Sequence, residues 1–321
     1  MKRIGVLTSG GDAPGMNPVI RAVVRSAVSF NMEITGIQRG FKGLYEKEFL
    51  ELNSRSVSGI INQGGTILKT NRFPEFKNSE VRKKCYENLI EAGIEGIVVI
   101  GGDGSAKGAY LLHSEFNFPV VHIPVSIDND VYGTDYTVGF DTAVNTAVEA
   151  IDKIRDTATS HERTFIIEVM GREKGNLAVE VAIACGAEIV IIPEIKVEFE
   201  KIVKSLKEQE RKGKKSSIII LAEGAGKAEV FAEKLRKEFP ERHIRYSILG
   251  YIQRGGSPTY MTRKLATLFG YHAVKMLKEG IYGYMVGIRR NEIVYFPLRK
   301  VVCTTKLPHL EYLNLIDYMA V

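Results

Sequence analysis

Residues 94–105 read IEGIVVIGGDGS, a continuous apolar run that ends in three glycines, one carboxylate and one hydroxyl. Short runs rich in Ile and Val are typical of strands that helices cover on both faces. Glycines directly after such a strand let main-chain N–H groups approach a bound phosphate, and a following helix N-terminus adds positive potential. The stretch therefore predicts a parallel α/β fold with a ligand at the carboxyl end of this strand.

The same pattern opens the chain, where residues 2–17 read KRIGVLTSGGDAPGMN. An apolar run leads there into Gly10, Gly11 and Asp12. Neither stretch fits the GxxxxGK[ST] phosphate loop or the GxGxxG dinucleotide fingerprint. Six expected strand ends carry glycine, carboxylate or arginine, which predicts a shared cleft for a phosphorylated substrate and a metal ion.

Apolar runs of strand length alternate with amphipathic segments of helix length. We expect strands at 3–8, 33–38, 96–101, 119–123, 164–170, 188–192, 216–222, 244–249 and 284–288. We expect helices at 18–30, 80–92, 142–157, 199–211, 229–238 and 263–279. Alternation of this kind favours largely parallel sheets between layers of helices. A chain of 321 residues exceeds the usual size of a single core, which favours two domains.

The bulk composition excludes several classes of function. The formal net charge is +6, from 44 basic and 38 acidic residues, and the densest basic run is only residues 210–215, so we expect no nucleic-acid partner. No apolar run approaches the roughly 20 residues of a membrane span, so we expect no membrane partner. Three cysteines far apart (Cys85, Cys185 and Cys303) favour buried or inert thiols and a cytoplasmic location.

Carboxylates in two stretches of the sequence point to phosphoryl transfer. Asp103, among phosphate-binding glycines, would repel a phosphate unless a divalent cation lies between them. Asp128 and Asp130 stand two residues apart and would point to one side of an extended segment. One of them can then act as a general base while the other holds magnesium.

Five arginines strengthen this interpretation, because guanidinium groups bind phosphate oxygens in bidentate fashion. They fall at or beside expected strand ends, and we expect them near the same rim as the glycine turns: Arg72, Arg163, Arg172, Arg245 and Arg254. A metal, arginine clamps and a carboxylate base are the parts of a phosphoryl-transfer site.

At this point the motifs resemble those of the bacterial-type ATP-dependent 6-phosphofructokinase family. The matching stretches run in order along nearly the whole chain: IGVLTSGGDAPGMN, RFPEF, VVIGGDGS, IDND, GTDYTVGF, EVMGR and IQRGGSP. The resemblance implies two similar three-layer α/β domains with the active site in the cleft between them. It places a nucleotide-binding domain at 1–138 plus 251–303 and a sugar-phosphate-binding domain at 139–250 plus 304–321.

The resemblance also implies the reaction, which is transfer of the γ-phosphoryl of MgATP to the 1-hydroxyl of fructose 6-phosphate in glycolysis. Asp128 matches the catalytic base, and Arg172 and Ser126 match groups at the transferring phosphoryl. The residues that match the ATP site are Gly11, Arg72, Phe73, Gly102, Asp103, Gly104 and Ser105, with Asp103 as the magnesium residue.

The matching sugar-phosphate contacts are Ser126, Ile127, Asp128, Met170, Gly171, Arg172, Glu223, Tyr251, Ile252, Gln253 and Arg254. Arg163 and Arg245 match arginines that reach the 6-phosphate from a neighbouring subunit of a homotetramer. An effector site for ADP and phosphoenolpyruvate is matched by Arg21, Arg25, Arg155, Gly186, Glu188, Lys212 and Lys214.

The sequence departs from the family pattern at a few positions. Val125 replaces the usual glycine, Tyr251 the usual histidine, and Ser54 and Gly59 an arginine and an aspartate of the effector region. Pyrophosphate-dependent relatives carry lysine at the position of Val125 and aspartate at that of Gly104, so their absence favours ATP. Three alternatives stay open: a pyrophosphate-dependent kinase, a tagatose 6-phosphate kinase, and a catalytically silent sugar-phosphate-binding regulator.

Overall fold

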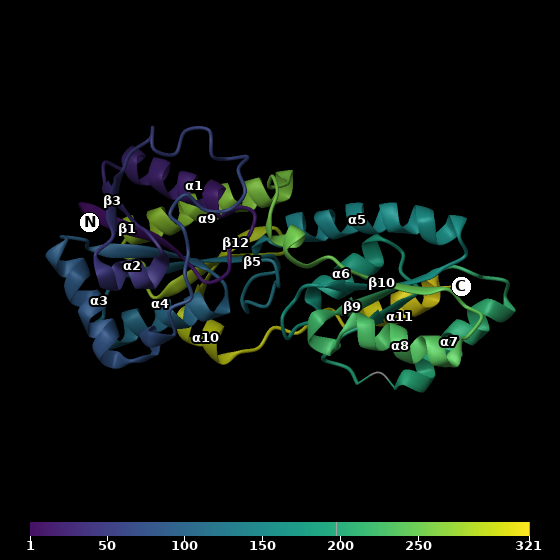
Figure 1. Ribbon diagram of the computed structural model, residues 1–321. Helices are drawn as coiled ribbons and strands as arrows, with labels where there is room; N and C mark the ends of the chain where they lie inside the picture. The colour runs from purple at the N-terminus through teal and green to yellow at the C-terminus, as the bar shows by residue number, and fades with distance from the viewer. Residues whose placement is uncertain (197, 321) are drawn as a thin grey trace. The chain divides into compact units, whose positions relative to one another are not determined.

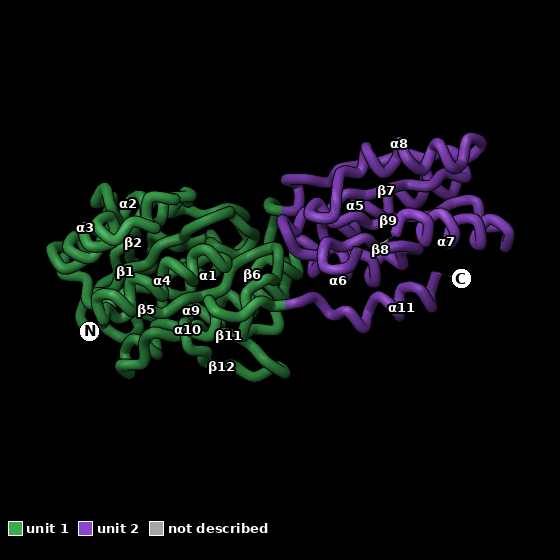
Figure 2. Tube along the Cα trace, turned by 90° about the horizontal axis from the view of Figure 1, so that it is seen from below, with its two compact units in different colours: residues 1–142, 254–306 green, residues 143–253, 307–321 purple. Residues whose placement is uncertain are grey.

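The computed structural model describes residues 1–196 and 198–320, which separate into two compact units (Figure 2). Unit 1 comprises Met1–Thr142 and Arg254–Lys306, and unit 2 comprises Ala143–Gln253 and the chain from Leu307 onward. The chain enters unit 2 within α5 (Phe140–Ser160), returns within the 3₁₀ helix η3 (Gly250–Arg254), and passes back into unit 2 after Lys306. The domain bounds predicted from the sequence each fall a few residues before these crossings.

The described strands of unit 1 form a mixed sheet in the order β12-β11-β5-β4-β1-β2-β3, with the short β6 paired to β5. Its interior strands are parallel, and only the two outermost strands, β12 and β3, run antiparallel to their neighbours. The bounds are β1 Arg3–Ser9, β2 Glu33–Ile37, β3 Phe49–Leu52, β4 Gly96–Gly101, β5 Val120–Ser126, β6 Val138–Gly139, β11 Tyr284–Arg289 and β12 Glu292–Pro297.

Helices cover both faces of this sheet, which explains why β4 is buried at every position (Figure 1). On one face α1 (Met16–Ser29) packs against α9 (Tyr260–Lys278), where Gly270 leaves room for Ala22 and the backbone of Val19. The other face carries α2 (Gly40–Glu46), α3 (Ser79–Glu91), α4 (Asp103–Phe116) and α10 (Leu298–Cys303) around one apolar cluster. The 3₁₀ helix η1 (Pro74–Lys77) precedes α3.

Unit 2 is built on a smaller, all-parallel sheet in the order β10-β7-β9-β8. The strands are β7 Thr164–Val169, β8 Ile189–Ile191, β9 Ser217–Ala222 and β10 Ile244–Ile248. An apolar cluster joins the sheet to α7 (Phe199–Arg211) and α8 (Ala228–Glu238). The helices α6 (Asn176–Ala184) and α11 (Glu311–Met319) pack against each other and against β8, and the 3₁₀ helix η2 (Glu223–Ala225) follows β9.

The predicted fold class is confirmed, and all the strands and helices expected from the sequence are present within a few residues of their predicted bounds. Apart from the 14-residue helix α4, which begins at the glycine turn after β4, the elements absent from the expected set are short or lack periodicity. The helix α6 reads NLAVEVAIA and is buried along most of its length, so its pattern shows no polar face. The edge strand β3 has only four residues.

The three cysteines were predicted to be buried or inert, and two of them are buried. Cys85 and Cys185 are buried, and burial raises the pKa of their thiols to about 12 and about 11. Cys303 is exposed because it lies at the last position of α10.

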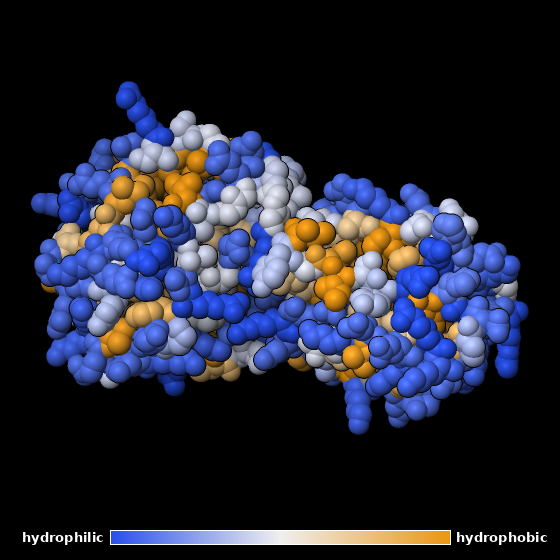
Figure 3. Space-filling model, in the orientation of Figure 1, coloured by the Kyte–Doolittle hydropathy of each residue, from blue (hydrophilic) through white to orange (hydrophobic). Residues whose placement is uncertain are grey.

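On the face seen in Figure 3 hydrophilic residues predominate, with hydrophobic residues in scattered patches. Among the described residues no helix is long and apolar enough to cross a bilayer.

Candidate active site

The carboxyl ends of β1, β4 and β5 bring the predicted donor residues together in unit 1. These strands are neighbours, with Ser9 paired to Gly101 and Gly101 paired to Pro124. The Ser105 hydroxyl donates to the Ser9 carbonyl at 3.0 Å, which joins the first turn of α4 to the end of β1. A Cβ atom on Gly101 would overlap both groups, so this approach requires glycine.

Asp103 occupies the first helical position of α4, after Gly102 as the N-cap. Its carboxylate is about one-third exposed and pairs with Lys107 one turn later, with Oδ2 and Nζ 2.7 Å apart. A Cβ atom on Gly104 would meet nothing within 4 Å, so the space beside Asp103 is open. The N-terminus of a 14-residue helix with open space before it suits the phosphates of a nucleotide.

Asp128 and Asp130 follow β5, one strand further along the same edge. A Cβ atom on Gly102 would lie 3.6 Å from the Ser126 Cβ, which places the two strand ends side by side. The Ser126 hydroxyl accepts from the Asp128 N–H at 3.1 Å and donates to Asp130 Oδ1 at 3.5 Å. Asp103 and Asp128 therefore lie at the ends of adjacent strands, as the sequence predicted.

The predicted extended geometry of this segment is wrong. Asn129 adopts a left-handed conformation with φ 49°, so Asp128 and Asp130 flank a tight turn rather than project from one side of a strand. The buried Asn129 side chain holds the turn by accepting from the Thr137 N–H at 3.0 Å and from Lys306 Nζ at 2.9 Å. Sequence reasoning missed both Asn129 and Lys306 as supports of this loop.

The long loop that carries Arg72 and Phe73 is fastened to the end of β1. Thr8 donates to the Lys69 carbonyl at 2.7 Å, and Thr70 donates to the Gly10 carbonyl at 2.9 Å. Phe73 packs against Tyr45, with ring centroids 5.8 Å apart, while Arg72 is exposed. The guanidinium of Arg254 also lies beside the glycine turn after β1. Its Nη1 is 3.8 Å from Asp12 Oδ1 and would lie 3.4 Å from a Cβ atom placed on Gly11.

Val125 is 1% exposed, so its branched side chain belongs to the core of unit 1 rather than to the surface near Asp103. Ile127 is also buried, at 4% exposure. The departure from the family pattern at position 125 therefore adds no bulk beside the open space at Gly104.

In unit 2 the ends of β7 and β9 bring Arg172 and Glu223 together. Arg172 has a left-handed backbone with φ 57°, and its N–H donates to Glu223 Oε1 at 2.5 Å. Met170 is buried and Gly171 has φ 143°, which leaves Arg172 as an exposed side chain at this edge.

The expectation that five arginines share one rim is wrong for two of them. Arg163 immediately precedes β7, and Arg245 is the second residue of the parallel strand β10, opposite Phe165. They lie at the amino ends of these strands, about 20 Å of strand away from Arg172. The turn before β7 explains the placement, because the Arg163 N–H bonds the Ala158 carbonyl at the end of α5.

The remaining predicted contacts lie on η3, where Tyr251 and Ile252 are exposed and Gln253 is buried.

Comparison with known proteins agrees with this geometry. The family model described as phosphofructokinase matches residues 3–277. This chain belongs to the phosphofructokinase family. It is 55% identical to the ATP-dependent 6-phosphofructokinase of Streptococcus sanguinis over 93% of this chain and 88% of that protein. It is 49% identical to the ATP-dependent 6-phosphofructokinase of Persephonella marina over the full length of both.

Solved structures of phosphofructokinases share the fold. The structure from Saccharomyces cerevisiae superposes with a TM-score of 0.89 at 34% identity over all of this chain, which spans 48% of the yeast chain. The pyrophosphate-dependent phosphofructokinase of Marinobacter aquaeolei superposes with a TM-score of 0.83 at 20% identity, over 99% of this chain and 92% of that one. The second likeness shows the fold alone.

The chain also brings together most of the predicted effector residues of unit 2. The buried carboxylate of Glu188 pairs with Lys214 at 2.9 Å and with Arg155 at 3.7 Å, and it accepts from the Ile218 N–H at 2.6 Å. Arg155 also donates to the Gly186 carbonyl at 3.0 Å. Lys212 is exposed at the C-cap of α7.

Arg21 and Arg25, the two arginines of unit 1 that were predicted to contact an effector, lie one turn apart on α1. Burial, together with the neighbouring charge of Arg25, lowers the pKa of Arg21 below its usual value. Two like charges on successive turns of a helix repel each other, so a bound anion would stabilise them.

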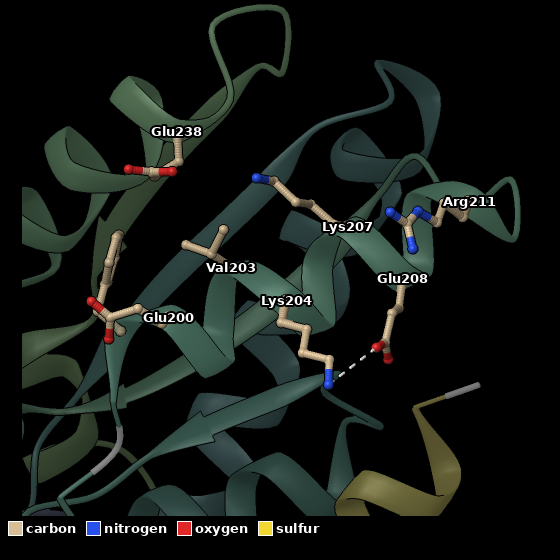
Figure 4. Close-up of a pocket in the computed structure, with 8 residues that line it drawn as sticks. Glu200, Val203, Lys204, Lys207, Glu208, Arg211 and Glu238 are labelled. Carbon is tan, nitrogen blue, oxygen red and sulfur yellow. Dashed lines mark ion pairs between the residues drawn. The ribbon is translucent and has the colours of Figure 1, made fainter.

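A groove of about 420 Å³ lies elsewhere in unit 2, between α7 and Glu238 of α8 (Figure 4). Its polar lining alternates in sign, and Lys204 pairs there with Glu208 at 4.0 Å. It contains no residue of the predicted site. Mixed charges on an exposed helix face are typical of a solvated surface.

Proposed function

We propose that this chain is an ATP-dependent 6-phosphofructokinase, which transfers the γ-phosphoryl of ATP to the 1-hydroxyl of fructose 6-phosphate. The observation that carries the proposal is the placement of Asp103 and Asp128 at the ends of the adjacent strands β4 and β5. The names of relatives near 50% identity support the same activity.

The residues at this edge fit magnesium delivered with the nucleotide. Among the described residues no group of three or more His, Cys, Asp or Glu side chains could cage a metal ion. Mg²⁺ is usually held by one or two carboxylates together with water and substrate phosphates. Asp103, about one-third exposed beside open space, would hold it in that way, and the bound ion would neutralise charge on the donor phosphates.

The chain's own groups would then perform the transfer. Asp128 takes the proton of the 1-hydroxyl as that oxygen attacks the γ-phosphorus, and the bond from phosphorus to the β-phosphate oxygen breaks to release ADP. The Ser126 hydroxyl fixes the Asp128 loop through the Asp128 N–H. Arg172 and Arg254 offer guanidinium groups to the moving phosphoryl and to the sugar.

ATP is the favoured donor because Gly104 leaves open space where pyrophosphate-dependent relatives carry a carboxylate, and Val125 is buried where they carry lysine. Initial rates with ATP and pyrophosphate, each with fructose 6-phosphate and tagatose 6-phosphate and with or without Mg²⁺, test the proposal. We expect turnover only with Mg²⁺ and ATP, and faster with fructose 6-phosphate. Faster turnover with pyrophosphate would overturn the choice of donor, and binding without any turnover would favour a silent regulator.

We further propose that the active site is completed by a second copy of the chain in a homotetramer, with ADP and phosphoenolpyruvate as effectors at the Glu188 cluster. Arg163 and Arg245 lie at the end of the unit 2 sheet opposite Arg172, so they cannot share one sugar phosphate with it in a single chain. Co-refolding an Asp128→Asn chain with an Arg163→Ala chain should restore activity that neither has alone. No recovery in verified hybrids would contradict the shared site.

A further inference from the structure

The loop that carries Arg172 is fastened at both ends by carboxylates from neighbouring strands of unit 2. It runs from Met170 to Gly175, between β7 and α6. The strands β8 and β9 lie beside β7 in the order β7-β9-β8, and each is followed by a glutamate that bonds the loop backbone. The loop itself closes with a bond from the Lys174 N–H to the Gly171 carbonyl at 2.9 Å.

The first attachment is Glu223, directly after β9. Its Oε1 accepts from the Arg172 N–H. The next residue, Gly224, packs so closely on Arg172 that a Cβ atom on Gly224 would overlap the Arg172 carbonyl oxygen. This attachment holds the peptide groups on both sides of the Arg172 Cα.

The second attachment is Glu194, three residues after β8. Its Oε1 accepts from the N–H of Gly175 at 2.9 Å, and Gly175 is the N-cap residue of the nine-residue helix α6. A Cβ atom on Gly175 would lie 2.6 Å from the Ile192 Cβ and 2.7 Å from Glu194 Oε2. The C-terminal end of the Arg172 loop is therefore packed directly against the glutamate.

The second oxygen of Glu194 is an independent sign of a specific role. Glu194 Oε2 is buried and has no hydrogen-bond partner among the described residues. An unsatisfied buried carboxylate oxygen costs stability, and a smaller apolar side chain would avoid that cost. The negative charge of Glu194 interacts favourably with the positive N-terminal end of α6, the helix that follows the loop.

We propose that Glu194 is a positioning residue for Arg172, holding the loop so that the guanidinium meets the phosphoryl group as it transfers. The inference rests on the proposed function, which gives Arg172 its contact with that group. Displacing a catalytic group by about 1 Å can lower a rate by about 10²-fold, so a loop fixed at only one end would lose much of the contribution of Arg172.

The Glu194→Ala variant tests this directly. We expect kcat to fall about 10- to 100-fold while KM for ATP and for fructose 6-phosphate changes by less than about threefold, because the lost contact strengthens only in the transition state. Glu173→Ala is the matched control, since Glu173 is an exposed glutamate of the same loop, and it should leave kcat unchanged. Glu194→Gln, which keeps an oxygen for the Gly175 N–H, should restore kcat to within about fivefold of the parent.

A double-mutant cycle with Arg172→Ala separates positioning from a general structural effect. If Glu194 acts through Arg172, adding Glu194→Ala to Arg172→Ala costs little further activity. A full multiplicative loss in the double variant, or unchanged kcat in folded Glu194→Ala, would overturn the inference. Near-normal turnover of Arg172→Ala alone would instead refute the role given to Arg172 in the proposed function.

Hydrogen exchange supplies a readout that does not depend on turnover. The Gly175 amide should exchange faster in Glu194→Ala than in the parent and remain protected in Glu194→Gln, and unchanged protection in Glu194→Ala would contradict the attachment. If Glu194→Ala does not fold, Glu194→Asp takes its place in the cycle. That variant keeps the charge but is one methylene shorter, so it should show the same loss of kcat.

Discussion

The two units of this chain differ in the side chains that bond the backbone around their strands. In unit 1 neutral hydroxyl and amide groups hold the backbone at the ends of β1 and β5, as when Ser105 bonds the end of β1 and Asn129 bonds the Asp128 loop. In unit 2 four carboxylates within or beside the strands accept from main-chain N–H groups. The pairs are Glu168 with Ala228, Glu188 with Ile218, Glu194 with Gly175, and Glu223 with Arg172.

The difference follows from the charges that each unit must hold near its ligands. The edge of unit 1 carries Asp103, Asp128 and Asp130, which are proposed to work with a cation and anionic phosphates. A further carboxylate there would add repulsion toward the phosphates, whereas hydroxyl and amide groups fix the backbone without net charge. Unit 2 offers arginines and lysines instead, and its buried carboxylates lie close to cations such as Lys214 and Lys227.

The largest effect we expect separates function from stability in unit 1. Asp128→Asn should lower kcat by about 10²–10⁴-fold, because the general base is lost, while the thermal midpoint stays close to that of the parent. Steady-state rates and a thermal melt on the same sample measure both quantities. Near-normal turnover would refute the base, and a large loss of stability would break the contrast between the units.

The next prediction compares the unfolding free energy that is lost when one side-chain bond is removed from each unit. Glu188→Gln removes the charge that faces Lys214 and Arg155, and we expect the unfolding free energy to fall by about 2 kcal/mol, because the two remaining cations are about one-third exposed and water compensates part of the lost interaction. Ser105→Ala removes a neutral bond and should cost about 1 kcal/mol. Denaturant titration of both variants checks the ranking, and equal losses would contradict the comparison.

The last effect concerns acid, which we expect to act on unit 1 through its core. His122 is fully buried, and burial lowers the pKa of its imidazole to about 3. The unfolded chain takes up this proton below about pH 6.5 and the folded chain does not, so the stability is full above that pH and falls by about 1.4 kcal/mol per unit as the pH drops toward 3.

The His122→Leu variant tests that expectation, because leucine has no proton to gain. Between pH 7 and pH 5 it should lose about 2 kcal/mol less unfolding free energy than the parent. His161→Gln, at an exposed histidine, is the matched control and should follow the parent curve. An unchanged pH dependence in His122→Leu would place the acid sensitivity elsewhere.

The sequence was sufficient for the fold because β4 and β9 are apolar at nearly every position and lead directly into a glycine and a carboxylate. It also predicted that Asp103 and Asp128 would lie at one edge of the sheet, since the carboxyl ends of parallel strands share that edge. It did not predict the turn between Asp128 and Asp130, although asparagine at 129 is a residue that tolerates the left-handed conformation.

The error about Arg163 and Arg245 arose because the sequence analysis treated the amino and carboxyl ends of a strand alike. Arg163 and Arg245 stand beside strands but at their amino ends, and a residue's distance from a strand in sequence does not by itself distinguish the two ends. Glu194 was missed because a single glutamate after Pro193 carries no motif. Its role appears only when β8 is placed beside β9 and the loop after β7 is placed against both.

The three points where the chain passes between the units have a mechanical consequence. On the unit 1 side each ends in an anchored residue: Thr142 bonds Thr262, Arg254 faces Asp12, and Lys306 bonds Asn129. A displacement of the chain at any of these crossings would therefore act directly on Thr262 of α9, on Asp12 of the first glycine turn, or on Asn129 of the Asp128 loop.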